Sequence, residues 1–460
     1  MASRQHKPEW ELPSLKDSHQ MPEIECDFYG VQFYPYTEPG VDPIFAIVGG
    51  KHILVCRPPE VGKENGRTEI IQYVTDEESS RDRMGNTIEE DYYTCVWTKD
   101  YETGDPLLCV AGLSATIKII NVVTGKLLRT LYGHGGDIND LIISPKTPYI
   151  LASASNDSSV RIWSLDPAHA KQPCTVILDG YGHRETVMSL SFHATGRYLL
   201  SAGVDHIINL WTLPELPDSK TGTNQPTRIY YPHFSTSEIH DNIVDCVAFS
   251  GDLILSKAAN ENCIVLWSIN NFDSAHPQPP LTSAPTTHDA QRDTRSAFSN
   301  PIPSSKGHSA PYVRLLQFNI PDSEIMFMRF SLFPGSHTMN PVLAFCNTSS
   351  KVYFWDLRRL EAYNDALDLG GDVKDPNVRP AFMNPFQHRV RGGGGAVARL
   401  HMQRAASPAE SSNSTNTGSD VQEREKDKAR NIDWERSMKG WRKKYEAGAS
   451  LVNIDAHKEE

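Results

Sequence analysis

The chain has 460 residues, of which 39% are hydrophobic and 22% are charged, proportions that are ordinary for a globular protein. It contains no apolar run near the ~18 residues needed to span a bilayer, and residues 1–21 are too polar for a signal peptide, so we expect an intracellular protein with no membrane partner. The net charge of −12 argues against a broad surface for nucleic acid, and a cationic protein tail is the better matched partner.

A six-residue pattern predicted to form the innermost strand of a repeat recurs along the chain, and each copy ends in a large apolar residue. The copies are FYGVQF (28–33), YYTCVW (92–97), INDLII (138–143), VMSLSF (187–192), VDCVAF (244–249) and IMFMRF (325–330). The shorter steps between copies, 46 and 49 residues, lie close to the ~40 to 45 residues of a WD-type blade. The pattern predicts an all-β fold, a WD-repeat β-propeller, whose function lies on its rims and in its central channel.

The first two blades follow an N-terminal extension of residues 1–27, in which residues 10–15 are a candidate strand for closing the ring. The propeller itself is predicted to run from residue 28 to residue 385. Further apolar runs rich in β-branched residues are expected to form strands of blades one and two, at 44–48, 52–56, 107–111 and 117–120.

Blades three and four carry the WD-repeat signature almost whole. The signature residues are His134, Asp157 and Trp163, then His183, Asp205 and Trp211. In such a repeat the Asp accepts hydrogen bonds in a tight turn, the His is buried and paired, and the Trp packs between blades. A catalytic relay or a metal site is the alternative interpretation, and it is disfavoured because these residues recur at repeat spacing whereas an active site need occur only once.

The C-terminal half of the chain combines two more blades with two irregular segments. Blade five is interrupted by residues 273–311, which are rich in Pro, Ser, Thr and His and poor in apolar residues, so we expect a flexible insert there. Blade six is expected to include strands at 342–346 and 351–357. Residues 386–460 are interpreted as an irregular, low-complexity and charged tail.

No residues of this sequence form a recognisable catalytic or metal-binding motif. The eight cysteines are scattered and include no CxxC pair, and Cys95 and Cys246 lie inside the inner-strand pattern, where small buried apolar residues are expected. The chain has no G-x-S-x-G, P-loop or H-E-x-x-H signature. We therefore expect no enzyme, no cofactor and no metal.

Three aromatic residues and a methionine lie at or beside the second position of the inner-strand pattern. These are Tyr29 in the first copy, Tyr93 in the second, and Met326 with its neighbour Phe327 in the sixth. Equivalent positions on the innermost strands of a propeller project at one level, so the side chains are expected to converge at one channel mouth. Aromatic faces hold a trimethylammonium group by cation–π attraction, and these residues are a candidate methyl-lysine cage. The alternative is that they are ordinary strand aromatics that fill the channel rim.

Five segments together resemble the embryonic ectoderm development (EED) and extra sex combs family of Polycomb repressive complex 2, over about residues 28–357. They are YYTCVW (92–97), PHFSTSEIH (232–240), VDC (244–246), GDLILSK (251–257) and MRFS (328–331). The resemblance implies a nuclear, noncatalytic, seven-bladed scaffold from a fungal or other divergent member. It also implies that one face binds a helix of the histone methyltransferase catalytic subunit, with a zinc-finger scaffold subunit in the same complex. The channel mouth would bind a trimethylated histone H3 tail and stimulate the catalytic subunit.

This sequence departs from the family pattern in two places that matter for function. Where this chain has Tyr29 the animal members of the family have Phe, and where it has Phe327 the family has Tyr, while Tyr93 is unchanged. The fourth residue of the family's cage is a Trp, and this chain has Met326 in its place. The resemblance therefore implies a cage that lacks one indole face and binds more weakly. Where the family supplies the inner strands of a seventh blade, this chain has residues 389–404, which include four consecutive glycines. The seventh blade is therefore expected to be incomplete or irregular.

A generic WD-repeat adaptor is the alternative function. Such a protein, for example the substrate receptor of a ubiquitin ligase, would use the same fold without an aromatic cluster at the channel mouth. No sequence-specific contact with nucleic acid is expected in either case.

Overall fold

The computed structural model describes residues 17, 21, 24–38, 41–59, 66–77, 80–81, 87–286, 294–298, 311–336, 340–358 and 450–453. The chain divides into two compact units, residues 1–354 together with 451–460, and residues 355–450. The first unit holds the sheets described below, apart from the last residues of β27 and the first residue of β28. The predicted closing strand at 10–15 and the segment 389–404 lie outside the described residues.

The described residues form six sheets of four or five strands, together with one short hairpin. The first sheet contains β1 (Gly30–Phe33), β2 (Phe45–Gly49), β3 (His52–Arg57) and β4 (Glu69–Thr75), and it is followed by the hairpin of β5 (Ser80–Arg81) and β6 (Thr87–Ile88). The second sheet contains β7 (Tyr92–Lys99), β8 (Pro106–Gly112), β9 (Ile117–Asn121) and β10 (Lys126–Leu131). The third contains β11 (Ile138–Ile143), β12 (Ile150–Ser155), β13 (Val160–Ser164), β14 (Cys174–Leu178) and β18 (Thr227–Ile229).

The remaining three sheets follow the same plan. The fourth sheet contains β15 (Val187–Phe192), β16 (Tyr198–Gly203), β17 (Ile208–Thr212), β19 (Phe234–Thr236) and β23 (Thr294–Ser296). The fifth contains β20 (Val244–Ser250), β21 (Leu253–Ala258), β22 (Cys263–Ile269) and β24 (Tyr312–Asn319). The sixth contains β25 (Ser331–Phe333), β26 (Val342–Cys346), β27 (Lys351–Asp356) and β28 (Ser450–Asn453). Two 3₁₀ turns, η1 (Pro167–His169) and η2 (Leu281–Ser283), lie in connecting segments.

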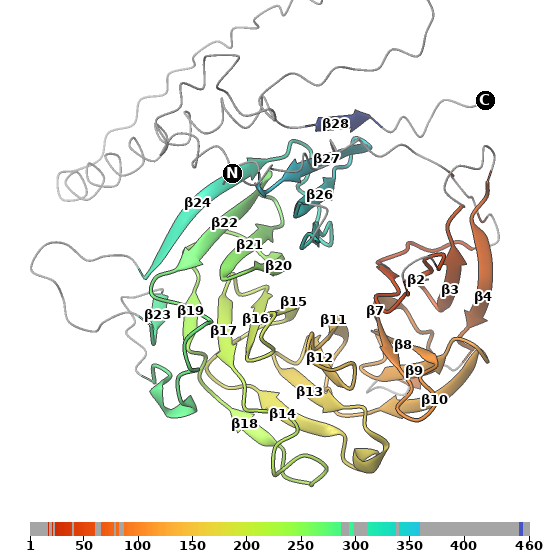
Figure 1. Cartoon of the computed structure of the whole chain (residues 1–460), viewed down its shortest axis with the longest axis horizontal. Coiled ribbons are helices and arrows are strands. Elements are labelled where there is room, and N and C mark those ends of the chain that lie inside the picture. The colour runs from red at the N-terminus through yellow and green to blue at the C-terminus, as the bar shows by residue number, and fades with distance from the viewer. Residues whose placement is uncertain are drawn as a thin grey trace, which may run out of the picture. The chain divides into compact units, whose positions relative to one another are not determined.

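Successive sheets stand side by side around a common centre, and the first strands β7, β11, β15 and β20 are the innermost strands of their sheets (Figure 1). Each sheet is antiparallel from its first strand to its fourth wherever the described residues define the pairing, and among these residues the one parallel pair joins β14 to β18. This is the radial arrangement of a WD-repeat propeller, so the predicted fold class is confirmed.

The innermost strands are bound to one another through side chains at the third position of the pattern. Thr94 Oγ1 accepts a hydrogen bond from the Leu141 amide at 3.2 Å, and Asp140 Oδ2 accepts one from the Leu190 amide at 2.8 Å. In the same way, the hydroxyl of Ser189 in β15 accepts a hydrogen bond of 3.1 Å from the Val247 amide of the next blade. An inner strand is a sheet edge whose free N–H groups need acceptors, and the preceding blade supplies them.

The second residue of four inner strands is a β-bulge. Pairing with the second strand of the sheet skips one residue in β7, β11, β15 and β20, and the skipped residues are Tyr93, Asn139, Met188 and Asp245. A bulge leaves its residue out of the ladder and re-aims its side chain, and bulges are frequent beside functional sites. The repeated bulge gives these four residues equivalent places at one end of the inner strands.

A buried chain of hydrogen bonds links the signature residues of each complete repeat. In the third sheet the Trp163 indole donates to Ser153 Oγ at 2.8 Å, Ser153 Oγ and His134 Nε2 lie 2.7 Å apart, and His134 Nδ1 lies 2.9 Å from Asp157. The same contacts recur in the fourth sheet among Trp211, Ser201, His183 and Asp205. Each Trp belongs to an apolar cluster shared with the preceding sheet.

A third hydrogen-bond chain of this kind lies in the fifth sheet, where the sequence did not predict one. Trp267 donates to Ser256, Ser256 contacts His240, and His240 lies against Glu261 in place of the usual aspartate. The WD-repeat signature requires Asp at this position, and this repeat has Glu261, so the signature did not identify it. The spacing of the histidine, serine and tryptophan was the available signal.

Within the predicted insert, β23 pairs with β19, and the carbonyl of Pro280 lies 3.1 Å from the buried His233 ring. Residues 287–293 and 299–310 of the insert lie outside the described residues. The sixth copy of the pattern, residues 325–330, was predicted to be a strand, but it forms a turn and an extended segment that precede β25.

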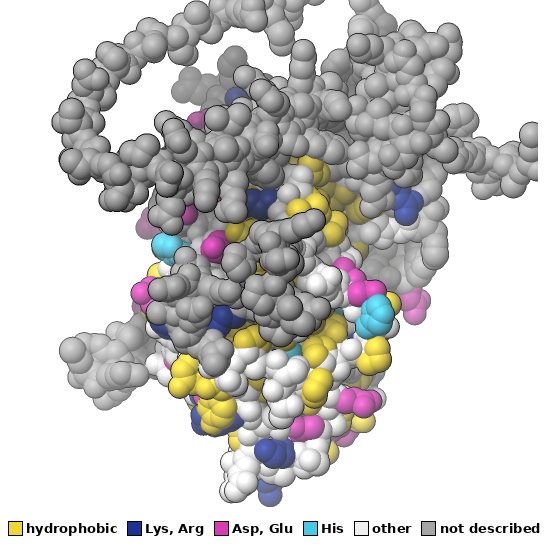
Figure 2. Space-filling view, turned by 90° about the vertical axis from the view of Figure 1, so that its left-hand side faces the viewer, with side chains coloured by type: hydrophobic (Ala, Val, Ile, Leu, Met, Phe, Trp, Pro, Cys, Tyr) yellow, Lys and Arg dark blue, Asp and Glu magenta, His cyan; other side chains and the backbone are white. Residues whose placement is uncertain are grey.

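Burial and surface composition agree with a polar exterior around an apolar interior. Cys95 and Cys246 are both buried, at the inner-strand positions where small apolar residues were expected. Acidic, basic and apolar side chains are interspersed over the described part of the face in Figure 2. Within the residues that the structure covers, no helix has the length and apolar character to cross a bilayer.

The aspartate of the third-sheet repeat predicts a defined loss of stability at acid pH. Burial alone would raise the pKa of the Asp157 carboxyl, but hydrogen bonds from His134, Ser159 and the Gly135 amide hold that pKa well below its usual range. A depressed folded-state pKa contributes stability above the unfolded pKa of about 4, and this contribution is lost as pH falls through and below that value. Asp157→Asn should lower the free energy of unfolding at pH 7 by about 1–3 kcal/mol.

Thermal unfolding of the wild type and Asp157→Asn between pH 6 and pH 3 checks this prediction. The variant should have the lower midpoint at pH 6, and the gap between the two proteins should narrow as pH falls. Asp42→Asn, which changes an exposed carboxylate, serves as the control. Parallel curves for the wild type and Asp157→Asn would contradict the assignment.

Candidate functional site

Three aromatic rings from distant parts of the chain meet at the bulged end of the inner strands. The Tyr29 and Tyr93 ring centroids are 5.7 Å apart with the planes at 86°, and the Tyr29 and Phe327 centroids are 6.2 Å apart with the planes at 62°. Edge-to-face pairs at these separations are favourable aromatic contacts. The structure therefore brings together the three aromatic residues that the sequence singled out.

The cluster is open to solvent. Tyr29 is 43% exposed and Phe327 is 36% exposed, whereas Tyr93 is partly buried. Met326, which directly precedes Phe327, is 37% exposed. Large aromatic side chains exposed together, rather than packed into the core, provide a surface that a ligand can contact.

Phe327 occupies its place through an unfavourable backbone conformation. Its φ angle is +68°, in the left-handed region that residues with a Cβ atom rarely adopt. The Phe327 amide donates a hydrogen bond of 2.9 Å to Asp245 Oδ2. Asp245 is the bulged residue of β20, so it lies at the position that corresponds to Tyr93 in β7.

Lys257 completes the support beneath this turn. Its ammonium group lies 3.2 Å from both carboxylate oxygens of Asp245 and donates to the Ile325 carbonyl at 3.4 Å. The side chains of this ion pair are 1% and 0% exposed. A buried ion pair with these additional hydrogen bonds satisfies groups that would otherwise be costly to bury.

Arg329 anchors the other end of the same segment. Its guanidinium donates to Asp140 Oδ1 at 2.7 Å and to the carbonyls of Asn139 and Met188 at 3.0 and 2.8 Å. Burial opposes the charge of Arg329, but the neighbouring Asp140 carboxylate outweighs that effect, so the pKa of Arg329 is raised. The segment before β25 is thus tied to the bulges of the third, fourth and fifth sheets. This network explains why residues 325–330 do not continue as a strand.

The sequence did not identify Asp140, Asp245, Lys257 or Arg329 as parts of the site. The position of Asp245 was a usable signal, because it is the second residue of its pattern copy, as Tyr93 is. The roles of Lys257 and Arg329 depend on contacts between blades, and no local spacing marks them.

Negative charge surrounds the rings. Burial, followed by the nearby Asp137 and Asp91 carboxylates, raises the pKa of Tyr93 to about 12. Burial and the charges of Asp91 and Asp27 also raise the pKa of Tyr29. Both phenols are therefore neutral at physiological pH, and their rings face an environment that favours a cation.

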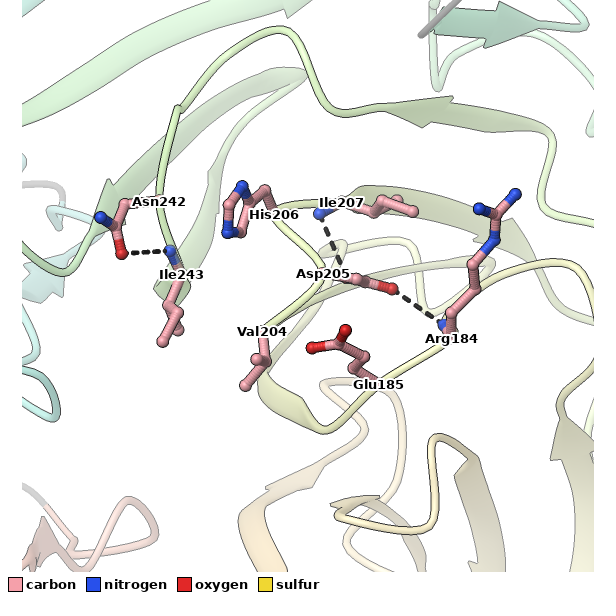
Figure 3. Close-up of a pocket in the computed structure, with 8 residues that line it drawn as sticks. All are labelled: Arg184, Glu185, Val204, Asp205, His206, Ile207, Asn242 and Ile243. Atoms are coloured by element: carbon pink, nitrogen blue, oxygen red, sulfur yellow. Dashed lines mark hydrogen bonds between the residues drawn. The ribbon is translucent and has the colours of Figure 1, made fainter. Parts of the chain in front are cut away.

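A hollow of about 530 Å³ lies at the same end of the inner strands of the fourth and fifth sheets. Figure 3 shows it between the segment at Arg184 and Glu185, the turn at His206, and Asn242. Several of its polar groups are engaged in turns, since Asp205 accepts from the amides of Arg184 and Ile207 and Asn242 accepts from the Ile243 amide. Its lining contains no aromatic residue other than the histidine, so it differs in kind from the cluster at Tyr29.

The geometry of the cluster suits the binding of a cation. Exposed aromatic faces beside carboxylates attract cations, and a methylated ammonium suits them best because it cannot form the full set of hydrogen bonds that water offers to an ordinary ammonium. The described residues contain no cluster of three or more His, Cys, Asp or Glu side chains able to hold a metal ion.

Comparisons with known proteins agree with this architecture. The family model "WD domain, G-beta repeat" matches residues 125–164 and 172–212. Polycomb protein EED of Chaetomium thermophilum is 48% identical over 372 residues, which cover 77% of this chain and 63% of that protein. Polycomb group protein FIE2 of Zea mays is 30% identical, with 68% of this chain and 72% of that protein covered.

Solved structures give the same result at the level of the fold. A chain in the crystal structure of an active polycomb repressive complex 2 in the basal state is 46% identical, with a TM-score of 0.72 and coverage of 78% of this chain and 73% of that one. A chain in the structure of ctPRC2 in complex with H3K27me3 is 42% identical, with a TM-score of 0.70 and 82% of each chain covered. With its repeats, its propeller and these similarities, the chain is a WD-repeat protein that belongs to the EED and esc family of Polycomb proteins.

Proposed function

We propose that the chain is the WD-repeat subunit of a Polycomb-type histone H3 lysine methyltransferase complex and that it binds a trimethylated histone tail between Tyr29, Tyr93 and Phe327. The single observation that carries this proposal is the convergence of the three rings at an exposed strand end beside carboxylates. The chain spans 63% of the length of the Chaetomium relative. The occurrence of similar chains in structures of polycomb repressive complex 2 supports the proposed methyltransferase partner. The geometry of the three rings supports trimethyl-lysine as the ligand.

The mechanism of recognition follows from the chemistry of the ligand. A trimethylammonium group carries a full charge but no N–H donor, so aromatic faces stabilise it by about 0.5–2 kcal/mol each, according to how well water is excluded. Asp91 and Asp137 add an attraction that also applies to the cationic residues of a histone tail. Met326 supplies a polarisable thioether at the place of a fourth wall, without the quadrupole of a ring.

Within the complex, the chain would act as a scaffold in the nucleus and would not perform the chemistry. Its partners would be the catalytic methyltransferase subunit, bound through a helix on one propeller face, and a zinc-finger scaffold subunit. Binding of the mark would stimulate the catalytic subunit if the methylated tail is bound more tightly in the active state than in the inactive one, because coupling between sites is a difference in affinities.

A peptide titration tests the binding site. The wild type should bind a trimethylated H3 tail peptide more tightly than the unmethylated peptide, and Tyr93→Ala should weaken the trimethylated complex by about 2- to 30-fold. Tyr101→Ala removes an exposed tyrosine in the turn between β7 and β8, outside the cluster, and it should leave the affinity unchanged. Equal affinities of a folded wild type for both peptides would overturn the proposed ligand.

Restoring a ring at position 326 tests the fourth wall. Met326→Trp should tighten binding of the trimethylated peptide by about 2- to 5-fold, because an indole face adds a cation–π contact at a partly exposed site. Isothermal titration of the variant and the wild type with both peptides measures this change. An unchanged affinity would show that position 326 does not face the ligand.

Co-purification separates the scaffold from a generic adaptor. A tagged chain expressed in its native cells should recover a histone methyltransferase and a zinc-finger subunit in near-equal amounts, as identified by mass spectrometry. Recovery of a cullin-linked assembly in their place would favour the adaptor of a ubiquitin ligase.

A further inference from the structure

We infer that Asp245 is a positioning residue of the proposed methyl-lysine site, where its buried carboxylate holds the left-handed turn that presents Phe327 to the ligand. The inference rests on the proposed function for the identity of the ligand. Asp245 does not touch the ligand itself, because its side chain is 0% exposed.

The turn needs an external constraint. Phe327 has a φ of +68°, and such a conformation costs about 1–2 kcal/mol for a residue with a Cβ atom. Met326 and Phe327 are also more than a third exposed, so core packing does not hold them in place. The hydrogen bond from the Phe327 amide to Asp245 is directed at the strained residue itself.

Asp245 can supply this constraint because its own position is determined by two features. The bulge in β20 removes residue 245 from the strand ladder and allows its side chain to reach Phe327. Lys257 then holds both carboxylate oxygens and also binds the Ile325 carbonyl, two residues before Phe327. One ion pair therefore fixes the turn at both its amide and its carbonyl.

The contact to Asp245 is distinct from the contacts of Arg329. Arg329 binds Asp140 and two carbonyls, and these contacts fix the chain after the turn. They leave the φ angle of Phe327 unconstrained. Loss of the acceptor at residue 245 should thus release the Phe327 ring while the segment stays attached through Arg329.

Two double variants separate the effect of the hydrogen bond between the Phe327 amide and residue 245 from the effect of the buried ion pair between residues 245 and 257. Asp245→Asn with Lys257→Met keeps an oxygen that can accept from the Phe327 amide, and Asp245→Leu with Lys257→Met removes it with nearly the same side-chain shape. Both variants lack the buried ion pair, and neither leaves an uncompensated charge, so both are expected to fold. His193→Met with Asp252→Leu removes a paired histidine and aspartate at the opposite strand ends and serves as the control.

The preference for trimethylated over unmethylated peptide is the first measurement. The Asn variant and the control should keep this preference within about threefold of the wild type, and the Leu variant should lose at least about tenfold, as expected for a hydrogen bond to a strained amide. Equal preferences in the Asn and Leu variants, with thermal midpoints alike, would overturn the positioning role.

Hydrogen exchange without any peptide separates this inference from the proposed function. The Phe327 amide should be protected in the wild type and in the Asn variant, and it should exchange rapidly in the Leu variant. If the wild type shows protection but no methyl preference, the positioning role stands and the proposed ligand fails. If the wild-type Phe327 amide exchanges as fast as an exposed amide, the positioning role fails. This outcome needs only the wild type, so it holds whether or not the Leu variant folds.

Discussion

The β-bulge at the second residue of the inner strands is the constraint on which the rest of the site depends. It occurs in β7, β11, β15 and β20, and each time it removes one residue from the strand ladder. The residues that directly follow the bulge keep the blades hydrogen-bonded to one another. The side chain of the bulged residue can then point to the end of the channel. The repeated bulge thus places a ring there at Tyr93 and a carboxylate at Asp245.

The site combines aromatic residues that are at least partly exposed with charged residues that are held in ion pairs. The rings of Tyr29, Tyr93 and Phe327 are accessible and neutral, which suits a cationic ligand. The ions that shape the segment before β25 are compensated, since Lys257 forms a fully buried pair with Asp245, and Arg329, whose side chain is partly exposed, pairs with Asp140. Within each ion pair the opposite charges largely cancel at the ligand, whereas a ring must be exposed for the ligand to contact its face.

The histidine-containing repeats show why residue types alone do not mark a functional site. His134 and Asp157 form the hydrogen bond that a catalytic pair would form, but Ser153 lies between the histidine and the Trp163 indole in a buried chain. The His134 side chain is 0% exposed, so no substrate can reach the ring. Recurrence of the same chain in the fourth and fifth sheets identifies it as a structural element of the blade.

The sequence by itself determined the repeat, the fold class and the aromatic residues of the candidate site. Each of these depends on a recurring local pattern, in which an apolar strand or a ring returns at an equivalent place, as Tyr29 and Tyr93 do. The tertiary structure alone decided the backbone of residues 325–330. Their pattern is that of an inner strand, but contacts with Asp140 and Asp245, 189 and 82 residues away, outweigh strand pairing. Such contacts form only when separate blades meet, so no local spacing could predict the turn that presents Phe327.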